Sequence, residues 1–141
     1  MKKLFSMINE AGTHPTGRVA RIAEAVFATG LLLKKGAAAG SVVVTAAATD
    51  IPLGFSVVPP DAIGDNVSVE LLTAPGTKTG VLAAGGAADG DLLVPAAGGT
   101  LQKTPAGAGT YYVCARALQT GVEGDEIEVE AFAPRPVVIT G

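Results

Sequence analysis

The most constraining feature of this sequence is an internal repeat with a spacing of 60 residues. Displacing the chain by 60 positions places residues 53–71 on residues 113–131 without a gap. Each copy has the pattern of a strand, a loop, a Gly-Asp turn and a strand of alternating apolar residues. A third, shorter copy is Asp89-Gly90-Asp91 followed by Leu92-Leu93-Val94. A single hairpin needs neighbours to cover its apolar face, so the repeat predicts several hairpins packed together.

The centre of each long copy is a hairpin turn, formed by Gly64-Asp65 in the first and by Gly124-Asp125 in the second. Glycine adopts positive φ without steric cost. The short aspartate side chain accepts hydrogen bonds from backbone amides just ahead of it. These four residues are therefore expected to shape the turns.

The rest of the chain beyond residue 30 consists of short β-type runs separated by Gly, Pro and Asp. This pattern predicts an all-β fold, a small β-barrel or sandwich of short antiparallel strands. We expect an N-terminal arm over residues 1–30, a β-domain over 31–134 with internally repeated hairpins, and a C-terminal tail over 135–141. In the arm, Val19, Ile22, Val26 and Phe27 have helical spacing, and both a short helix and an extended arm fit these residues.

Composition excludes several classes of protein. The single Cys114 cannot form an intramolecular disulfide, and the single His14 gives no Cys/His cluster for zinc. The longest uncharged run, residues 36–49, is too short to span a bilayer. With 48% hydrophobic residues and 16% charged ones, the chain has more apolar surface than one small core needs, which favours binding to partners.

Charge is distributed unevenly along the chain. Residues 1–35 contain six basic and two acidic residues, whereas residues 36–141 contain four basic and eleven acidic ones. A basic arm on an acidic body indicates that the arm contacts something negative. The basic residues are too dispersed for a nucleic-acid footprint, so we expect the arm to face an acidic protein surface or solvent, with no direct nucleic-acid contact.

No catalytic, metal or cofactor site is predicted. His14 lies in a turn of the arm, and Cys114 lies in an apolar β-type run, where a buried and inert thiol is typical. No phosphate-binding Gly-rich motif is complete. The alternating Glu126, Glu128 and Glu130 are typical of a solvated strand face, not of converging calcium ligands. We therefore expect a protein that is not an enzyme.

Several short stretches, taken in order, resemble the tailed-bacteriophage capsid decoration (cement) protein family. They cover roughly residues 29–131. Pro52-Leu53-Gly54-Phe55 matches the strand before the first Gly-Asp hairpin of that family, whereas Ala115 stands where its later strand has glycine. The other matching stretches are Gly30–Gly36, Gly64–Val69, Ala88–Asp91, Gly98–Leu101, Cys114–Leu118 and Gly124–Val129.

The resemblance implies a small β-barrel or sandwich on the outer surface of an icosahedral virion, made in the host cytoplasm. Its partners would be the major capsid protein and itself, with a homotrimer favoured and a dimer also open, and without a membrane. Such a protein cements the head by bridging neighbouring capsid subunits. The alternative from the residues is a non-catalytic binding module on a virion surface that recognises a glycan or a protein. The expected capsid-contacting arm residues are Lys2, Lys3, Phe5, Arg18, Val19, Arg21, Ile22 and Phe27.

Overall fold

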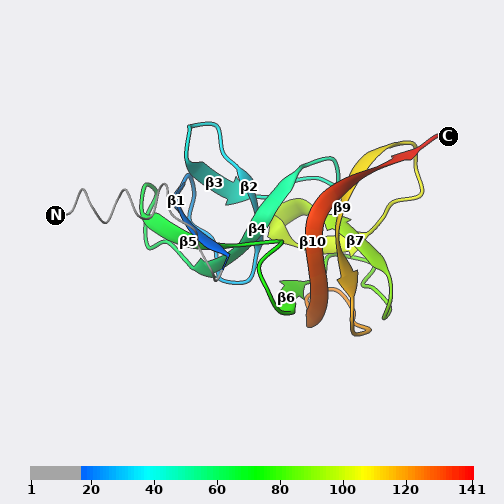
Figure 1. The fold of residues 1–141 in the computed structure, drawn as a ribbon. Coiled ribbons are helices and arrows are strands. Elements are labelled where there is room, and N and C mark those ends of the chain that lie inside the picture. The colour runs from blue at the N-terminus through cyan, green and yellow to red at the C-terminus, as the bar shows by residue number, and fades with distance from the viewer. Residues whose placement is uncertain (1–16) are drawn as a thin grey trace.

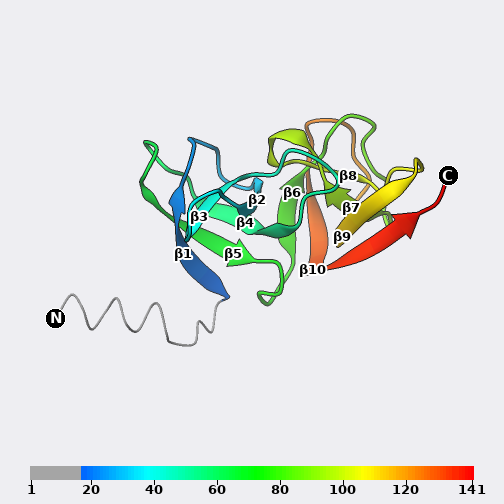
Figure 2. The ribbon, with the colours of Figure 1, turned by 90° about the horizontal axis from the view of Figure 1, so that it is seen from above.

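The computed structural model describes residues 17–141, which form two β-lobes along one long axis (Figures 1 and 2). The predicted all-β class is confirmed. The first lobe is a closed barrel of β1 (Arg18–Ala23), β2 (Leu32–Lys35), β3 (Ser41–Val44), β4 (Pro52–Val58) and β5 (Asn66–Leu71). The second is a five-stranded sheet of β6 (Lys78–Val81), β7 (Leu92–Pro95), β8 (Leu101–Lys103), β9 (Gly109–Ala117) and β10 (Glu126–Ile139), with the short 3-10 helix η1 (Ala97–Gly99) before β8.

The barrel is mixed, although antiparallel strands were expected. Its order is β1-β3-β2-β4-β5, and β1 closes it by pairing parallel with β3 and antiparallel with β5. Strand direction cannot alternate all the way round a ring of five strands, because five is odd. One parallel pair is therefore the smallest departure that allows closure, and it falls at β1 and β3.

Residues 18–23 are a strand, so of the two conformations left open for this part of the arm the structure has the extended one. Arg18, Ala20 and Ile22 point outward, while Val19 and Ala23 face the barrel interior. The helical spacing of the apolar residues is outweighed because β1 has hydrogen-bonding strands on both sides. The β-structure thus starts earlier than the expected boundary at residue 31.

The β-structure also ends later than expected, because β10 continues through Ile139 in the expected tail. Its C-terminal half pairs with residues 109–113 of β9, after a register shift between Ala131 and Arg135. Strand β6 pairs with β10 only as far as Val129, so the later part of β10 has no second partner among the described residues. Pro134 and Pro136 suit this edge, because proline lacks the N–H that a second neighbour would need.

In the structure, the 60-residue displacement relates all five strands of one lobe to those of the other. Strands β1, β2 and β3 begin at residues 18, 32 and 41, and β6, β7 and β8 begin at 78, 92 and 101. The neighbour order β3-β2-β4-β5-β1 corresponds to β8-β7-β9-β10-β6. Even the parallel pair Ile22 and Ser41 has its equivalent, the single bridge between Leu82 and Leu101. The second lobe is therefore the same five-stranded unit, but its first and last strands in the sheet are joined only by this single bridge.

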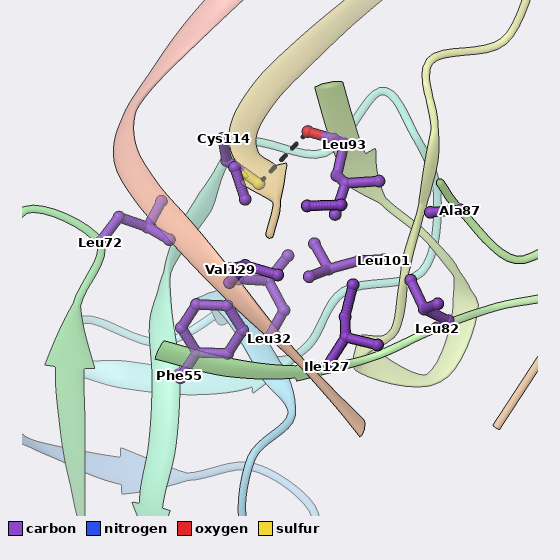
Figure 3. Close-up of a cluster of buried hydrophobic side chains, with 12 residues drawn as sticks. Leu32, Phe55, Leu72, Leu82, Ala87, Leu93, Leu101, Cys114, Ile127 and Val129 are labelled. Atoms are coloured by element: carbon purple, nitrogen blue, oxygen red, sulfur yellow. Dashed lines mark hydrogen bonds between the residues drawn. The ribbon is translucent and has the colours of Figure 1, made fainter. Parts of the chain in front are cut away.

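The two lobes share one hydrophobic core. Leu32, Phe55 and Leu72 of the barrel side pack with Leu82 and Leu101 of the other lobe, in the cluster drawn in Figure 3. Complete burial of a leucine side chain contributes about 1.5–3 kcal/mol, so this contact is a strong link between the lobes. One smaller cluster fills the barrel interior, and another packs the first half of β9 against the second half of β10.

Candidate interaction surface

The Gly-Asp turns use their carboxylates internally. Gly64 and Gly124 have φ values of 94° and 87°. Asp65 Oδ2 accepts hydrogen bonds from the backbone N–H groups of Asp61 and Ala62, both at 3.0 Å. Asp125 Oδ2 accepts one from the N–H of Val122 at 2.9 Å. These oxygens bind the backbone of their own turns, which gives the two aspartates a structural role.

Each turn also holds the adjacent strand in place. The Gly64 N–H donates to Ala23 O at 2.9 Å, and the Ala23 N–H donates to Asp65 O at 2.9 Å. The second lobe repeats both bonds with Leu82 in the place of Ala23, again at 2.9 Å each. The turns therefore tie the β4–β5 and β9–β10 hairpins to the closing strand of each lobe.

The predicted arm residues fall into three groups in the structure. Lys2, Lys3 and Phe5 lie outside the described residues. Arg18 and Ile22 are exposed on the outer face of β1, where Ile22 retains 46% of its accessible area. Val19 and Arg21 are half-buried, and Phe27, at 7% exposure, belongs to the barrel core. Of the eight predicted contact residues, Arg18 and Ile22 are therefore the exposed ones within residues 17–141.

Exposed apolar side chains gather at the end of the barrel that carries the turn before β5. Ile22, Val26, Val58 and Ile63 have exposed fractions of 46%, 60%, 53% and 71%. We call these four residues the barrel tip. The loop that carries Val26 and the turn that carries Ile63 meet through the bonds of Ala23 described above.

A shallow groove of about 380 Å³ adjoins the barrel tip. It runs over the outer face of β1, β5 and the end of β4, and it is lined by Arg18, Val19, Ala20, Val58, Asn66, Val67 and Ser68. Ala20 pairs with Ser68, and Ser68 pairs with Val58, so small side chains form the floor beside the larger Val58. The groove makes the tip and the exposed face of β1 one continuous surface.

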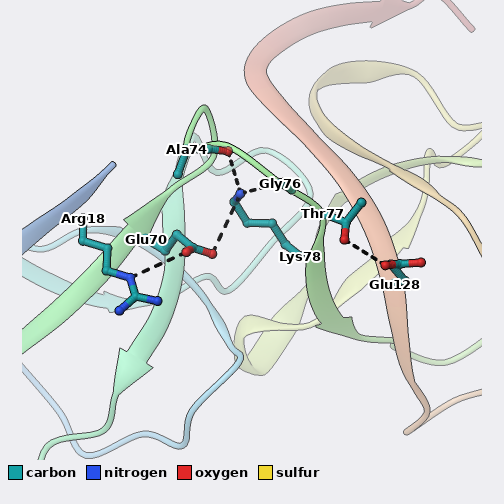
Figure 4. A network of polar contacts seen from close by, with 7 residues as sticks. All are labelled: Arg18, Glu70, Ala74, Gly76, Thr77, Lys78 and Glu128. Carbon is teal, nitrogen blue, oxygen red and sulfur yellow. Dashed lines mark hydrogen bonds and ion pairs between the residues drawn. The ribbon is translucent and has the colours of Figure 1, made fainter. Parts of the chain in front are cut away.

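Glu70 on β5 links the outer face of β1 to the junction between the lobes (Figure 4). Its Oε2 lies 3.6 Å from Arg18 Nε, and its Oε1 lies 3.8 Å from Lys78 Nζ. Lys78 has only 1% of its side chain exposed, and its Nζ donates to Ala74 O at 2.8 Å and to Gly76 O at 3.2 Å. This buried ammonium group therefore holds residues 72–77, the segment that joins the two lobes.

A second carboxylate, Glu24, fastens the loop between β2 and β3. Its Oε2 accepts hydrogen bonds from Ser41 Oγ at 2.6 Å and from the Ala38 N–H at 2.9 Å. The hydrogen bond from Ser41, followed by that from Ala38, lowers the pKa of Glu24 below its usual value. The group therefore stays ionised and holds the loop against the end of β1.

The surface of the second lobe has a different character. Glu126, Glu128 and Glu130 are exposed along β10, while Ile127 and Val129 between them are buried. Glu130 Oε1 lies 3.6 Å from Arg116 Nη1, and Glu128 accepts a hydrogen bond from Thr77 Oγ1 at 2.8 Å. The equivalent positions of β5 carry Asn66, Ser68 and Glu70, so this face has one carboxylate in the barrel and three in its repeat.

The described residues contain no group of three or more His, Cys, Asp or Glu side chains placed to hold a metal ion. Cys114 is fully buried, and desolvation raises its pKa to about 12. Its thiol donates a weak hydrogen bond to Leu93 O at 3.8 Å (Figure 3). Among residues 17–141 there is also no helix of the length and hydropathy that a membrane crossing requires.

Sequence reasoning did not single out Val58 and Ile63, and it assigned Val26 only to the apolar spacing of the arm. The signal available in the sequence was the mismatch within the repeat, where exposed Ile63 of one turn corresponds to Glu123 of the other. The gathering of all four apolar residues at one end depends on barrel closure, which brings β1 beside β5.

No protein-family profile matches this sequence, and no curated protein matches it. The fold does resemble a solved structure, that of the head fiber gp8.5 N base in bacteriophage phi29. The two chains are 20% identical, with a TM-score of 0.64, and the match covers 84% of this chain and 95% of the other. The likeness therefore includes most of both lobes.

Proposed function

We propose that this protein is a structural protein attached to the outside of a tailed-phage head. The observation that carries the proposal is the likeness in fold to the phi29 head fiber base, which extends over 84% of the chain. The sequence resemblance to capsid decoration proteins supports the same placement independently. A fold alone does not fix function, so the proposal needs the binding test given below.

The burial of Cys114 and the hydrogen bonds of the turn aspartates support a role in binding instead of catalysis. The Cys114 thiol is desolvated, and Asp65 and Asp125 use their carboxylates within turns. A protein fixed by its surface needs a rigid scaffold, and the core shared by the lobes supplies one.

In the finer form of this proposal, the protein bridges neighbouring subunits of the major capsid protein and acts as a trimer. The basic side chains of the N-terminal arm, Lys2, Lys3, Arg18 and Arg21, face acidic groups of the shell, while Phe5 and Ile22 add apolar contacts. The burial of Phe27 and the half-burial of Val19 assign these two residues to support of the contact strand.

The test is co-sedimentation of the purified protein with undecorated phage heads, together with light scattering of the free protein. Saturable binding at a copy number comparable with that of the shell protein is expected. Heads that bind the protein should also resist heating better than bare heads. Absence of binding would remove the proposed function, and a monomer in light scattering would remove its trimeric form.

A further inference from the structure

The internal repeat allows the exposed apolar residues of the barrel tip to be compared with the equivalent residues of the second lobe. Ile63 and Glu123 occupy the same position in two turns of the same geometry, each just before a Gly-Asp pair. Because Leu82 takes the place of Ala23 in the hydrogen bonds described above, Val26 corresponds to Gly85. Because the second lobe folds with glutamate and glycine at these positions, the fold itself does not require exposed isoleucine and valine there.

The exposed side chains of the tip are apolar, and two charged groups beside it have partners within the protein. The carboxylate of Asp65 accepts two backbone hydrogen bonds in its own turn, and Arg18 beside the groove is paired with Glu70. A partner that covers the four apolar side chains of the tip is therefore itself apolar. This differs from the basic arm, for which an acidic partner is expected.

The position of the tip favours the head shell as its binding partner. The turn before β5 lies at one end of the long axis, and the C-terminal end of β10 lies at the other (Figures 1 and 2). The tip is also continuous, through Ile22 and the groove, with the strand β1 that the proposed function places against the head. An elongated protein that attaches by this strand brings the tip to the same surface.

We propose that the barrel tip, formed by Ile22, Val26, Val58 and Ile63, binds an apolar patch on the shell protein of the head. This inference rests on the proposed function and names the surface and the partner that it uses. Contact through the tip is hydrophobic and hence insensitive to salt, whereas contact through the arm is weakened by salt.

The experiment measures binding of the full-length protein to undecorated heads at about 0.1 M and about 1 M salt. The variant Ile63→Glu introduces the residue that the second lobe has at this position, and Val26→Glu places the same charge in the neighbouring loop of the tip. Each should weaken binding by about tenfold or more at both salt concentrations, because burial of an exposed valine or isoleucine is lost. The matched controls Val122→Glu and Val138→Glu change residues that are each 68% exposed but lie in the second lobe, and their binding should equal that of the wild type.

All four side chains are largely exposed, so their thermal unfolding midpoints should be close to that of the wild type, and circular dichroism checks this. Binding by Ile63→Glu and Val26→Glu that equals wild-type binding would overturn the inference and leave the proposed function intact. Equal losses in the two controls would overturn it as well. A drop in the molecular mass of free Ile63→Glu, with unchanged head binding, would assign the tip to contact between copies and also overturn it. Failure of the wild type to bind heads would overturn both proposals.

Discussion

Replacing Glu70 by Gln should destabilise the protein far more than replacing Arg18 by Gln, although both changes break a contact of the same carboxylate. Arg18 is half exposed, and exposed ion pairs contribute about 0–1 kcal/mol. Lys78 is buried, and at the observed 3.8 Å a pair of unit charges attracts by about 4 kcal/mol at an effective dielectric constant near 20. In the native state this attraction offsets the cost of removing the ammonium group from water.

In Glu70→Gln, the Lys78 ammonium group keeps only the carbonyls of Ala74 and Gly76. Loss of one partner of a fully buried pair costs about 3–5 kcal/mol. Glu70 itself is 24% exposed, which allows some compensation by water. We therefore expect a loss of about 2–3 kcal/mol in the free energy of unfolding for Glu70→Gln, against about 0.5 kcal/mol for Arg18→Gln.

Urea denaturation of the two single variants, and of Glu70→Gln combined with Lys78→Met, measures these differences. The double variant should recover more than half of the loss, because the buried cation that had lost its partner is removed with it. Equal losses in Arg18→Gln and Glu70→Gln would refute the reasoning. So would a double variant that loses as much stability as Glu70→Gln alone.

Three further predictions concern other elements. In Gly54→Ala the new Cβ would clash with the backbone oxygen of Glu70, so we expect the free energy of unfolding, measured by heat or urea, to fall by about 3 kcal/mol or more. The control Gly107→Ala, where the nearest atom is 3.9 Å from the new Cβ, should lower it by less than about 0.5 kcal/mol. The lowered pKa of Glu24 means that its contribution to stability is complete above the usual carboxyl range and is lost as pH falls through the folded pKa. The thermal midpoint should therefore fall below about pH 4, and Glu24→Gln should reduce that fall; an unchanged pH profile would contradict this. Cys114 should resist thiol-specific labelling near pH 8 in the native state and react after unfolding in urea, and rapid native labelling would show that the thiol is accessible.

The all-β class could be predicted because its signals are local. Alternation of apolar residues, as in residues 126–130, places side chains on two faces of a strand whatever its partner is. A Gly-Asp pair forms a turn through positive φ at glycine and backbone bonds to the aspartate, which needs only four or five consecutive residues. Apart from the short copy at residues 89–94, the repeat was visible in the sequence only in residues 53–71 and 113–131, where both copies keep these signals.

The remaining strands of the repeat diverge in sequence while keeping their place in the fold. Strand β1 illustrates this, because its side chains also fit a helix, and only pairing with β3 and β5 selects the extended form. Strand β10 illustrates it at the other end, where it runs through Pro134 and Pro136 into the expected tail. Prolines are compatible with a strand that has one free edge, and the sequence does not tell which edge is free.

The sequence by itself therefore determined the class of fold, the positions of the turns and the alternation within strands, since each depends on neighbouring residues. The tertiary structure decided which residues are surface and which are core: Phe27 entered the barrel, Lys78 became a buried cation between the lobes, and Ile22, Val26, Val58 and Ile63 came together at one end. The physical reason is that barrel closure joins residues more than 40 positions apart, such as Ala20 and Ser68, and burial is set by those contacts.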